Sequence, residues 1–185
     1  MDVAGNDQVS ETESQVEPIK RHRDVVEIKK LLKDDVRNST LFILGINTDL
    51  TPDELIDLKI SQVNDLGINE HLVLSDEKTG KTKKITMNRS AIHAIRSLID
   101  SDNFSNDDNL FKSQSNPRKP PNLDRLVKKW CLAINLKGRF GEETLRKTWG
   151  YHQHHYFGIS VQRLTEHFQF EKKEETIKYL QLEDE

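Results

Sequence analysis

Residues 41–63 read LFILGINTDLTPDELIDLKISQV and hold the clearest structural signals of the chain. Residues 39–47 are apolar enough to form a buried helix. Directly after them, Thr51 can cap a new helix, Pro52 suits the first helical position, and Glu54 stands three residues after the cap. These residues predict two successive helices, the second beginning at Thr51.

Helix and strand patterns continue on both sides of this stretch. Upstream, residues 24–34 carry their apolar side chains on one helical face. Downstream, residues 71–76 and 81–87 have the composition of strands and flank a turn at residues 77–80, where Gly80 permits a positive φ. We expect an antiparallel β-hairpin here.

The second half of the chain is predicted to be helical. Asn88 and Asn122 can each cap a helix, and polar loops separate the two. Three more helical stretches are expected at approximately residues 142–157, 160–168 and 172–181. The predicted fold class is α+β, a mostly helical domain with one small antiparallel sheet.

Charge is distributed unevenly along the 185 residues. Residues 1–18 hold five acids and no base and lack hydrophobic periodicity, so we interpret them as a disordered acidic leader. The folded domain is expected over residues 19–182, which hold all 28 Lys and Arg against 23 of the 31 Asp and Glu. This excess is usable for DNA binding, although the solvated faces of an ordinary charged protein would show the same pattern.

Several classes of protein and site are excluded or disfavoured. The chain has no apolar run long enough to span a membrane and no signal peptide, so we expect a soluble, cytoplasmic protein. A single cysteine, Cys131, cannot form an internal disulfide or a multi-cysteine zinc site. His152, His154 and His155 invite a metal, but no carboxylate or cysteine completes the set at a clear spacing. We therefore expect no metal and no cofactor.

Five segments in a fixed order carry a resemblance to a known family. They read LFILGINTDLTPDELIDLKISQV, EKTGKTKKITMN, ETLRKTWGYH, LTEHFQF and TIKYL. Their order and separation resemble the catalytic domain of the tyrosine recombinases, the phage integrase family. The resemblance covers residues 19–182, almost the whole folded part.

The resemblance implies a specific chemistry. In this family a tyrosine hydroxyl attacks a DNA phosphodiester and forms a 3′-phosphotyrosyl link, without a metal or a nucleotide. Two arginines, a hairpin lysine, two histidines and the tyrosine supply the cations, the proton donors and the nucleophile that such a phosphoryl transfer needs. The implied partner is double-stranded DNA.

Some of these positions are retained in this chain. By resemblance, Lys78 matches the general-acid lysine, Arg146 the second arginine and Tyr179 the nucleophile. The later histidine matches either His167, which lies twelve residues before Tyr179, or Phe170, which stands at the commoner separation and has no donor. We favour Phe170 as the matched position.

Other positions depart from the family pattern. Where the family usually reads like TGLR this chain has TDLT, so Thr51 replaces the first arginine and Asp49 replaces a glycine. Glu143 stands where the family usually has a histidine or another donor, and a carboxylate only accepts hydrogen bonds. Glu143 also lies one helical turn before Arg146 and can pair with it.

These departures predict weak or absent strand cleavage. Losing one preorganised donor commonly costs about 10²–10³ in rate, so two losses could remove about 10⁴ or more. Two alternatives remain open: an active DNA strand transferase that uses Tyr179, and an accessory protein that partners an active recombinase, or a second copy of itself, through the C-terminal helix.

The DNA-contacting surface is expected to be basic and incomplete. The N-terminal helical domain that normally completes the family's clamp around DNA is expected to be absent. The candidate DNA-binding residues are Lys78, Lys81, Lys83, Arg125, Lys128, Lys129, Arg146 and Lys147.

Overall fold

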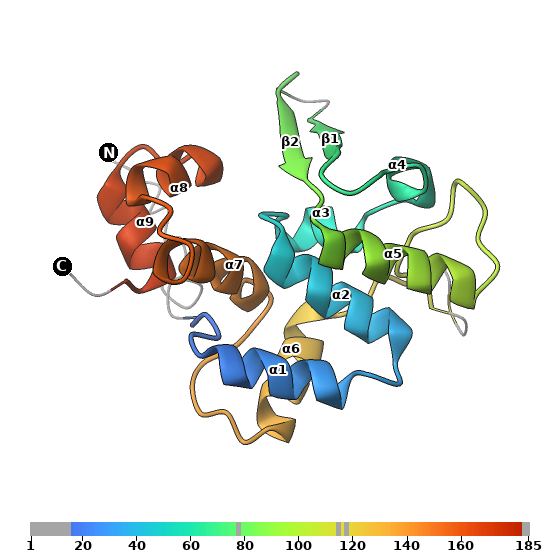
Figure 1. The fold of residues 1–185 in the computed structure, drawn as a ribbon, viewed down its shortest axis with the longest axis horizontal. Coiled ribbons are helices and arrows are strands. Elements are labelled where there is room, and N and C mark those ends of the chain that lie inside the picture. Colours follow the sequence, from blue (N-terminus) through green and yellow to red (C-terminus); the bar gives the residue numbers. More distant parts are fainter. Residues whose placement is uncertain (1–15, 77–78, 114–115, 117–118, 183–185) are drawn as a thin grey trace, which may run out of the picture.

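A computed structural model describes residues 16–76, 79–113, 116 and 119–182 (Figure 1). The element order within these residues is α1 (His22–Leu31), α2 (Val36–Asn47), α3 (Pro52–Ile56), α4 (Ile60–Val63), β1 (His71–Ser75), β2 (Thr82–Thr86), α5 (Arg89–Ser101), α6 (Leu123–Ala133), α7 (Thr144–His155), α8 (Val161–Phe168) and α9 (Lys173–Leu180). The fold class predicted from the sequence is confirmed, a mostly helical chain with one two-stranded antiparallel sheet.

Helix α2 forms the centre of the main core. It packs against α5 on one side and α7 on another. Leu41, Phe42 and Leu44 are fully buried on it, and the Phe42 ring meets Trp130 of α6 edge to face at 5.8 Å. An apolar helix with neighbours on several sides is the expected result of a sequence with little polar character.

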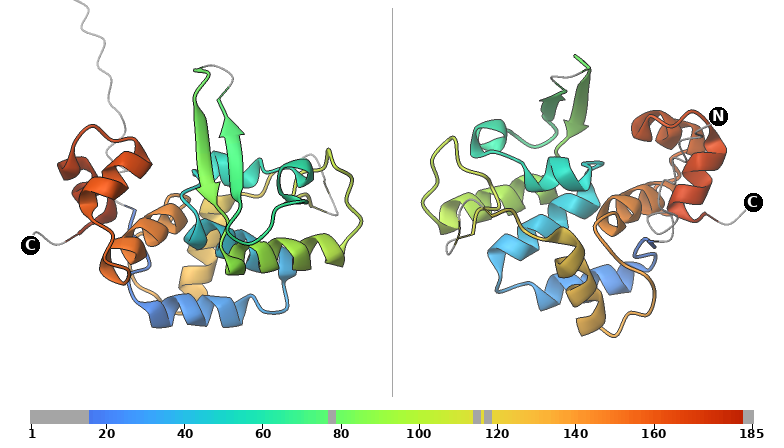
Figure 2. Two further views of the ribbon diagram at one scale, coloured as in Figure 1. Left: turned by 45° about the horizontal axis from the view of Figure 1, so that its top comes forward. Right: turned by 180° about the vertical axis from the view of Figure 1, so that it is seen from behind.

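The hairpin of β1 and β2 projects from the helical body (Figures 1 and 2). Its register pairs Leu72 with Ile85, and both of these side chains are buried at the base of the hairpin. The turn residues 77 and 78 lie outside the described residues.

A smaller lobe is formed by α8 and α9 where they pack on α7 (Figure 2). Leu164, Phe168 and Leu180 make its buried cluster, separate from the main core. Trp149 and Tyr179 pack against this cluster. The candidate nucleophile thus belongs to the smaller lobe.

The predicted elements are largely confirmed, with two differences. Helix α4 was not predicted, because its single turn is too short to show periodicity. Residues 16–18, assigned to the leader, pack on the fold, where the Val16 carbonyl accepts hydrogen bonds from Lys147 and Gln181. These partners are more than a hundred residues away, so local composition could not reveal them. Residues 1–15 of the leader lie outside the described residues.

No helix in the described ranges is both long and apolar enough to cross a membrane.

Candidate active site

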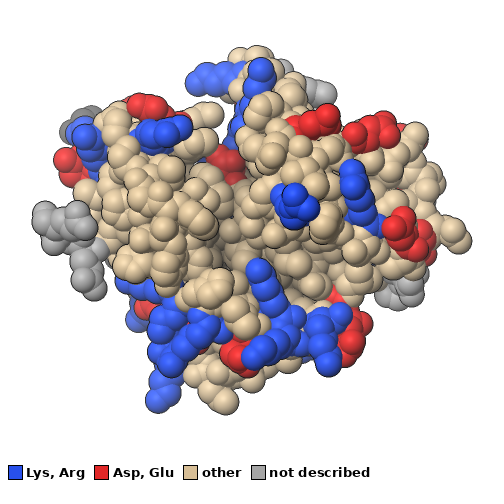
Figure 3. All heavy atoms as spheres, in the orientation of Figure 1, with Lys and Arg blue, Asp and Glu red and all other residues tan. Residues whose placement is uncertain are grey.

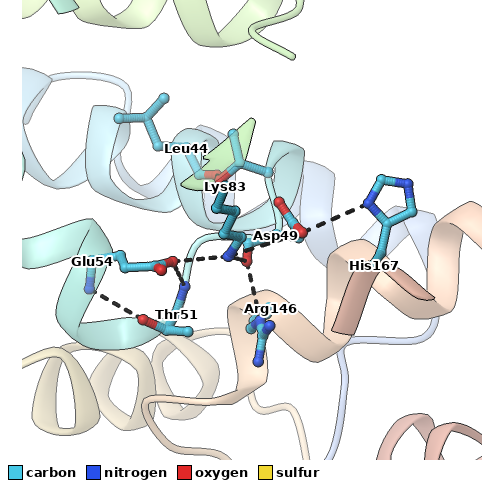
Figure 4. A network of polar contacts seen from close by, with 8 residues as sticks. Leu44, Asp49, Thr51, Glu54, Lys83, Arg146 and His167 are labelled. Atoms are coloured by element: carbon cyan, nitrogen blue, oxygen red, sulfur yellow. Dashed lines mark hydrogen bonds and ion pairs between the residues drawn. The ribbon is translucent and has the colours of Figure 1, made fainter. Parts of the chain in front are cut away.

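The loop between α2 and α3 lies at the centre of the polar contacts of the candidate site (Figure 4). The hydroxyl of Thr48 donates to the Leu44 carbonyl at 2.7 Å where α2 ends. The Thr51 hydroxyl then accepts the Glu54 amide at 3.2 Å, and the Glu54 carboxylate accepts the Thr51 amide at 2.8 Å. This capping box confirms the predicted start of α3.

Lys83 reaches this loop from strand β2. Its ammonium donates to the Asp49 carbonyl oxygen at 2.7 Å and to Glu54 Oε2 at 2.9 Å. The Asp49 carboxylate, itself buried, lies 3.9 Å from the same ammonium. Lys83 is therefore held by the loop in which the first arginine of the pattern is missing.

Arg146 reaches the same loop from helix α7. Its Nε donates to the Asp49 carbonyl oxygen at 3.1 Å, so this one oxygen accepts from both Arg146 and Lys83. The guanidinium also stacks over the Phe168 ring, with its central carbon 4.9 Å from the ring centroid. Polar and aromatic contacts together fix the position of Arg146.

Tyr179 approaches from α9. Its hydroxyl donates to Glu143 Oε2 at 2.5 Å, so the Glu143 carboxylate is bonded to the tyrosine. Burial raises the pKa of the Tyr179 hydroxyl, the charge of Glu143 raises it further, and the positive charge of Arg146 partly opposes both. The surroundings of this hydroxyl thus favour its neutral form.

His167 and Phe170, the two candidates for the later histidine, lie at different places in the site. His167 is about half exposed, and its Nδ1 is 3.8 Å from the Asp49 carboxylate. The Phe170 ring packs against Tyr179 at 5.3 Å between centroids. His167 is thus near the loop with the missing arginine, whereas Phe170 adjoins Tyr179, the candidate nucleophile.

Residues 19–185 match the model of the phage integrase family. This chain belongs to that family. A curated relative, the probable integrase/recombinase YoeC of Bacillus subtilis (strain 168), is 33% identical over 141 residues, which are 74% of this chain and 74% of that protein.

Solved recombinase structures share the fold. The crystal structure of XerA recombinase matches with a TM-score of 0.72 at 17% identity, over 91% of this chain and 60% of that chain. The XerH site-specific recombinase bound to a palindromic difH substrate matches with a TM-score of 0.70 at 13% identity, over 100% of this chain and 52% of that chain. This phage integrase family member thus spans 60% or less of these two recombinase chains.

Lys147, one of the candidate DNA-binding residues, is inside the protein. Its side chain is fully buried, its ammonium donates to the Val16 carbonyl at 2.7 Å, and the same ammonium lies 4.7 Å from the centre of the Tyr179 ring. Burial lowers the pKa of Lys147, although the nearby Glu143 charge opposes this. The expectation that Lys147 contacts DNA is therefore corrected, because in this structure the side chain is buried and its ammonium is bonded to the Val16 carbonyl.

The other candidate basic residues lie on the surface or outside the description. Arg125 and Lys129 are exposed on α6, and Lys128 is exposed but paired with Asp124 at 2.7 Å. In Figure 3, Lys and Arg gather on the part of the surface where α1 lies. Lys78, matched to the general acid, lies outside the described residues.

A hollow beside the site is more acidic than basic. It has a volume of about 560 Å³ and lies between α3 and the hairpin. Its lining includes Asp53, Glu54, Asp57 and Asp76 against Lys81 and Lys83. This surplus of carboxylates weakens the attraction that Lys81 and Lys83 exert on a phosphate at the hollow.

Two of the three histidines of α7 bond to the backbone. Nε2 of His152 donates to the Ile19 carbonyl at 2.8 Å, and Nδ1 of His154 donates to the Ile159 carbonyl at 2.8 Å. Within the residues that the structure describes, no group of three His, Cys, Asp or Glu side chains is arranged to hold a metal.

Sequence reasoning missed the two contacts that most affect the site. The bond from Tyr179 to Glu143 joins residues 36 apart, and no local pattern predicts it. The inward position of Lys83 had a signal, because Lys83, Ile85 and Met87 alternate with exposed residues along β2 and its end.

Proposed function

We propose that this chain binds double-stranded DNA as the catalytic domain of a site-specific tyrosine recombinase, with impaired strand cleavage through Tyr179. One observation carries the proposal. Arg146 and Tyr179, the matched arginine and nucleophile, both contact the Phe168 ring, while the tyrosine hydroxyl is bonded to the Glu143 carboxylate. The central parts of the family's site are thus together, with a negative charge among them.

The DNA partner follows from family membership and from surface charge. The related XerH structure is a complex with its difH substrate, which supports a similar partner here. The proposed phosphate contacts are four exposed basic side chains: Arg125, Lys128 and Lys129 on α6, and Lys81 near the hairpin turn. Arg146 and Lys83 would contact phosphate at the site itself.

Impaired cleavage follows from the charges around the nucleophile. A tyrosine attacks phosphate well only when cations or a base favour loss of its proton. Here burial and Glu143 raise the pKa of Tyr179, and Thr51 brings no guanidinium. A DNA phosphate placed for attack by Tyr179 would also bring its oxygens close to the Glu143 carboxylate, which repels them.

Association through α9 is a further part of the proposal. Exposed residues of this helix, including Glu174 and Lys178, would contact a second copy or another recombinase on DNA. Sedimentation of the full chain with and without DNA tests this, and a single copy per duplex at all concentrations would contradict it.

Trapping of a covalent intermediate tests the function. The protein is incubated with nicked suicide substrates made from DNA that flanks its gene, and products are separated under denaturing conditions to reveal a protein–DNA adduct. We compare the unaltered chain with Tyr179→Phe and with a restored variant, Thr51→Arg, Glu143→His, Phe170→His. DNA binding is measured in parallel by a mobility shift.

The expected result is DNA binding by all three proteins and an adduct that is strong only in the restored variant. A strong adduct from the unaltered chain, lost in Tyr179→Phe, would show an active strand transferase and contradict impaired chemistry. Absence of DNA binding by the unaltered chain would contradict the whole proposal.

A further inference from the structure

Lys83 and Arg146 converge on one oxygen atom, although they come from different elements. Lys83 lies on β2 and Arg146 on α7, and both donate to the carbonyl oxygen of Asp49, at 2.7 and 3.1 Å. The distance between Lys83 Nζ and Arg146 Nε therefore cannot exceed the sum of these two hydrogen-bond distances. Two positive charges thus stand side by side in the site (Figure 4).

The ammonium of Lys83 also lies beside the backbone of Thr51. One carboxylate oxygen, Glu54 Oε2, accepts the Thr51 amide at 2.8 Å and the Lys83 ammonium at 2.9 Å. The side chain of Thr51 carries no positive charge, but the Lys83 ammonium places one next to the Thr51 backbone. It arrives from the hairpin instead of from the start of α3.

The Lys83 ammonium keeps some capacity for a further partner. An ammonium has three N–H donors, and two of them are used by the Asp49 carbonyl and by Glu54. The Asp49 carboxylate at 3.9 Å is beyond hydrogen-bond distance. The side chain is 16% exposed, and it borders the hollow beside α3.

The two carboxylates limit what this cation can do. Asp49 and Glu54 oppose the charges of Lys83 and Arg146, so the four groups are close to neutral as a set. An ammonium also lacks the two-pronged geometry of a guanidinium. A phosphate oxygen bound by Lys83 would therefore be held less tightly than by an arginine.

Resting on the proposed function, we infer that Lys83 replaces the family's first arginine as the second cation that contacts the DNA phosphate beside Arg146. The charge lost at Thr51 is supplied by a lysine of β2. Lys83 is thus a phosphate-binding residue of the site, distinct from the hairpin-turn lysine matched to the general acid.

The salt dependence of DNA binding tests this role. Each neutralised phosphate contributes about 0.9 to the slope of the logarithm of the binding constant against the logarithm of salt concentration. On a duplex from the DNA flanking the gene, we expect Lys83→Gln to lower the steepness by about 0.9. Adding Thr51→Arg to that variant is expected to restore it.

Two controls separate this role from general charge and from folding. Lys84→Gln removes the same charge from the neighbouring, exposed position of β2, and we expect it to keep the original slope. Lys83→Met retains the apolar stem and should repeat the result of Lys83→Gln. All proteins are compared below their thermal unfolding midpoints.

The outcomes distinguish this inference from the proposed function. If both Lys83 variants bind DNA with an unchanged slope, the role of Lys83 is overturned and the proposed function still stands. A reduced slope that Thr51→Arg does not restore would have the same meaning. If the unaltered chain does not bind DNA, the proposed function fails and the inference fails with it.

Discussion

The hydroxyl of Tyr179 combines the chemistry expected of a nucleophile with surroundings that oppose it. Burial, then the Glu143 charge, raise the pKa of Tyr179, and the bond to Glu143 at 2.5 Å needs the proton in place. We expect Tyr179 to remain neutral at about pH 10–11, where an unperturbed tyrosine ionises. Near-ultraviolet tyrosinate absorbance of the unaltered chain minus that of Tyr179→Phe measures this.

A substitution at Glu143 provides the control for that titration. Glu143→Gln removes the negative charge while leaving Tyr179 buried. The ionisation of Tyr179 should then move to lower pH without reaching its ordinary range. A difference spectrum that shows tyrosinate near pH 10 in the unaltered chain would contradict the interpretation of this site.

Lys147 predicts a pH dependence of stability. Burial is the main cause that lowers the pKa of Lys147 in the folded protein. At a pH between this lowered pKa and about 10.5, Lys147 is protonated in the unfolded chain and mostly neutral in the folded protein. The free energy of unfolding from Lys147 therefore rises with pH in that window. Urea denaturation from about pH 8 to about pH 10 should show this rise, and Lys147→Met should lack it.

The matched control for Lys147 is an exposed lysine. Lys84→Met also removes one ammonium but leaves the buried charge in place. We expect Lys84→Met to keep the pH dependence of the unaltered protein. An identical dependence in Lys147→Met would mean that Lys147 is charged equally in both states.

At the scale of elements, the contact between α2 and α7 brings the loop that contains Asp49 next to the guanidinium of Arg146. Gly45 permits this contact, because a Cβ there would lie 2.8 Å from Leu145 Cβ and would also overlap Leu145 Cδ1. Backbone-anchored atoms cannot yield as the end of a flexible side chain can. The position of the site therefore depends on a glycine near the C-terminal end of an apolar helix.

Gly45→Ala should destabilise the protein. Overpacking typically costs about 1–3 kcal/mol, whereas alanine gains up to about 1 kcal/mol of helix propensity over glycine. We expect a net loss in the free energy of unfolding, measured by urea denaturation. Equal or higher stability would contradict close packing of α2 on α7.

Sequence patterns predicted the elements better than their contacts. The capping box at Thr51 and the side-chain cap of Asn88 on the Ala91 amide involve neighbours three residues apart, so the local sequence contains both partners. The single turn of α4 had no such signal. Val16 joined the fold because distant side chains bond its carbonyl.

At the scale of the molecule, the chain has a large core and a small one. The main core extends over α1 to α7, whereas the lobe of α8 and α9 is held by Leu164, Phe168 and Leu180. Tyr179, the proposed nucleophile, lies on α9, in the smaller of the two. A lobe with few buried apolar residues is expected to open more easily than the rest.

Native-state hydrogen exchange tests this division. Amides of α8 and α9 should exchange through openings that need less free energy than those of α2 and α5. Leu180→Ala should cost about 2–5 kcal/mol, as truncations of buried leucine do, and its effect should concentrate in the small lobe. An equal acceleration across all helices would contradict two separate clusters.

The sequence by itself determined the family and, apart from α4, the order of the helices and the hairpin, and it predicted Arg146 and Tyr179 as site residues. Caps, periodicity and short motifs depend on residues close along the chain, so they can be recognised there. Only the tertiary structure decided which polar groups form hydrogen bonds: Lys83 with the Asp49 carbonyl across 34 residues, Tyr179 with Glu143 across 36, and Lys147 with the Val16 carbonyl across 131. Packing of whole elements sets those pairs, and no local pattern records it.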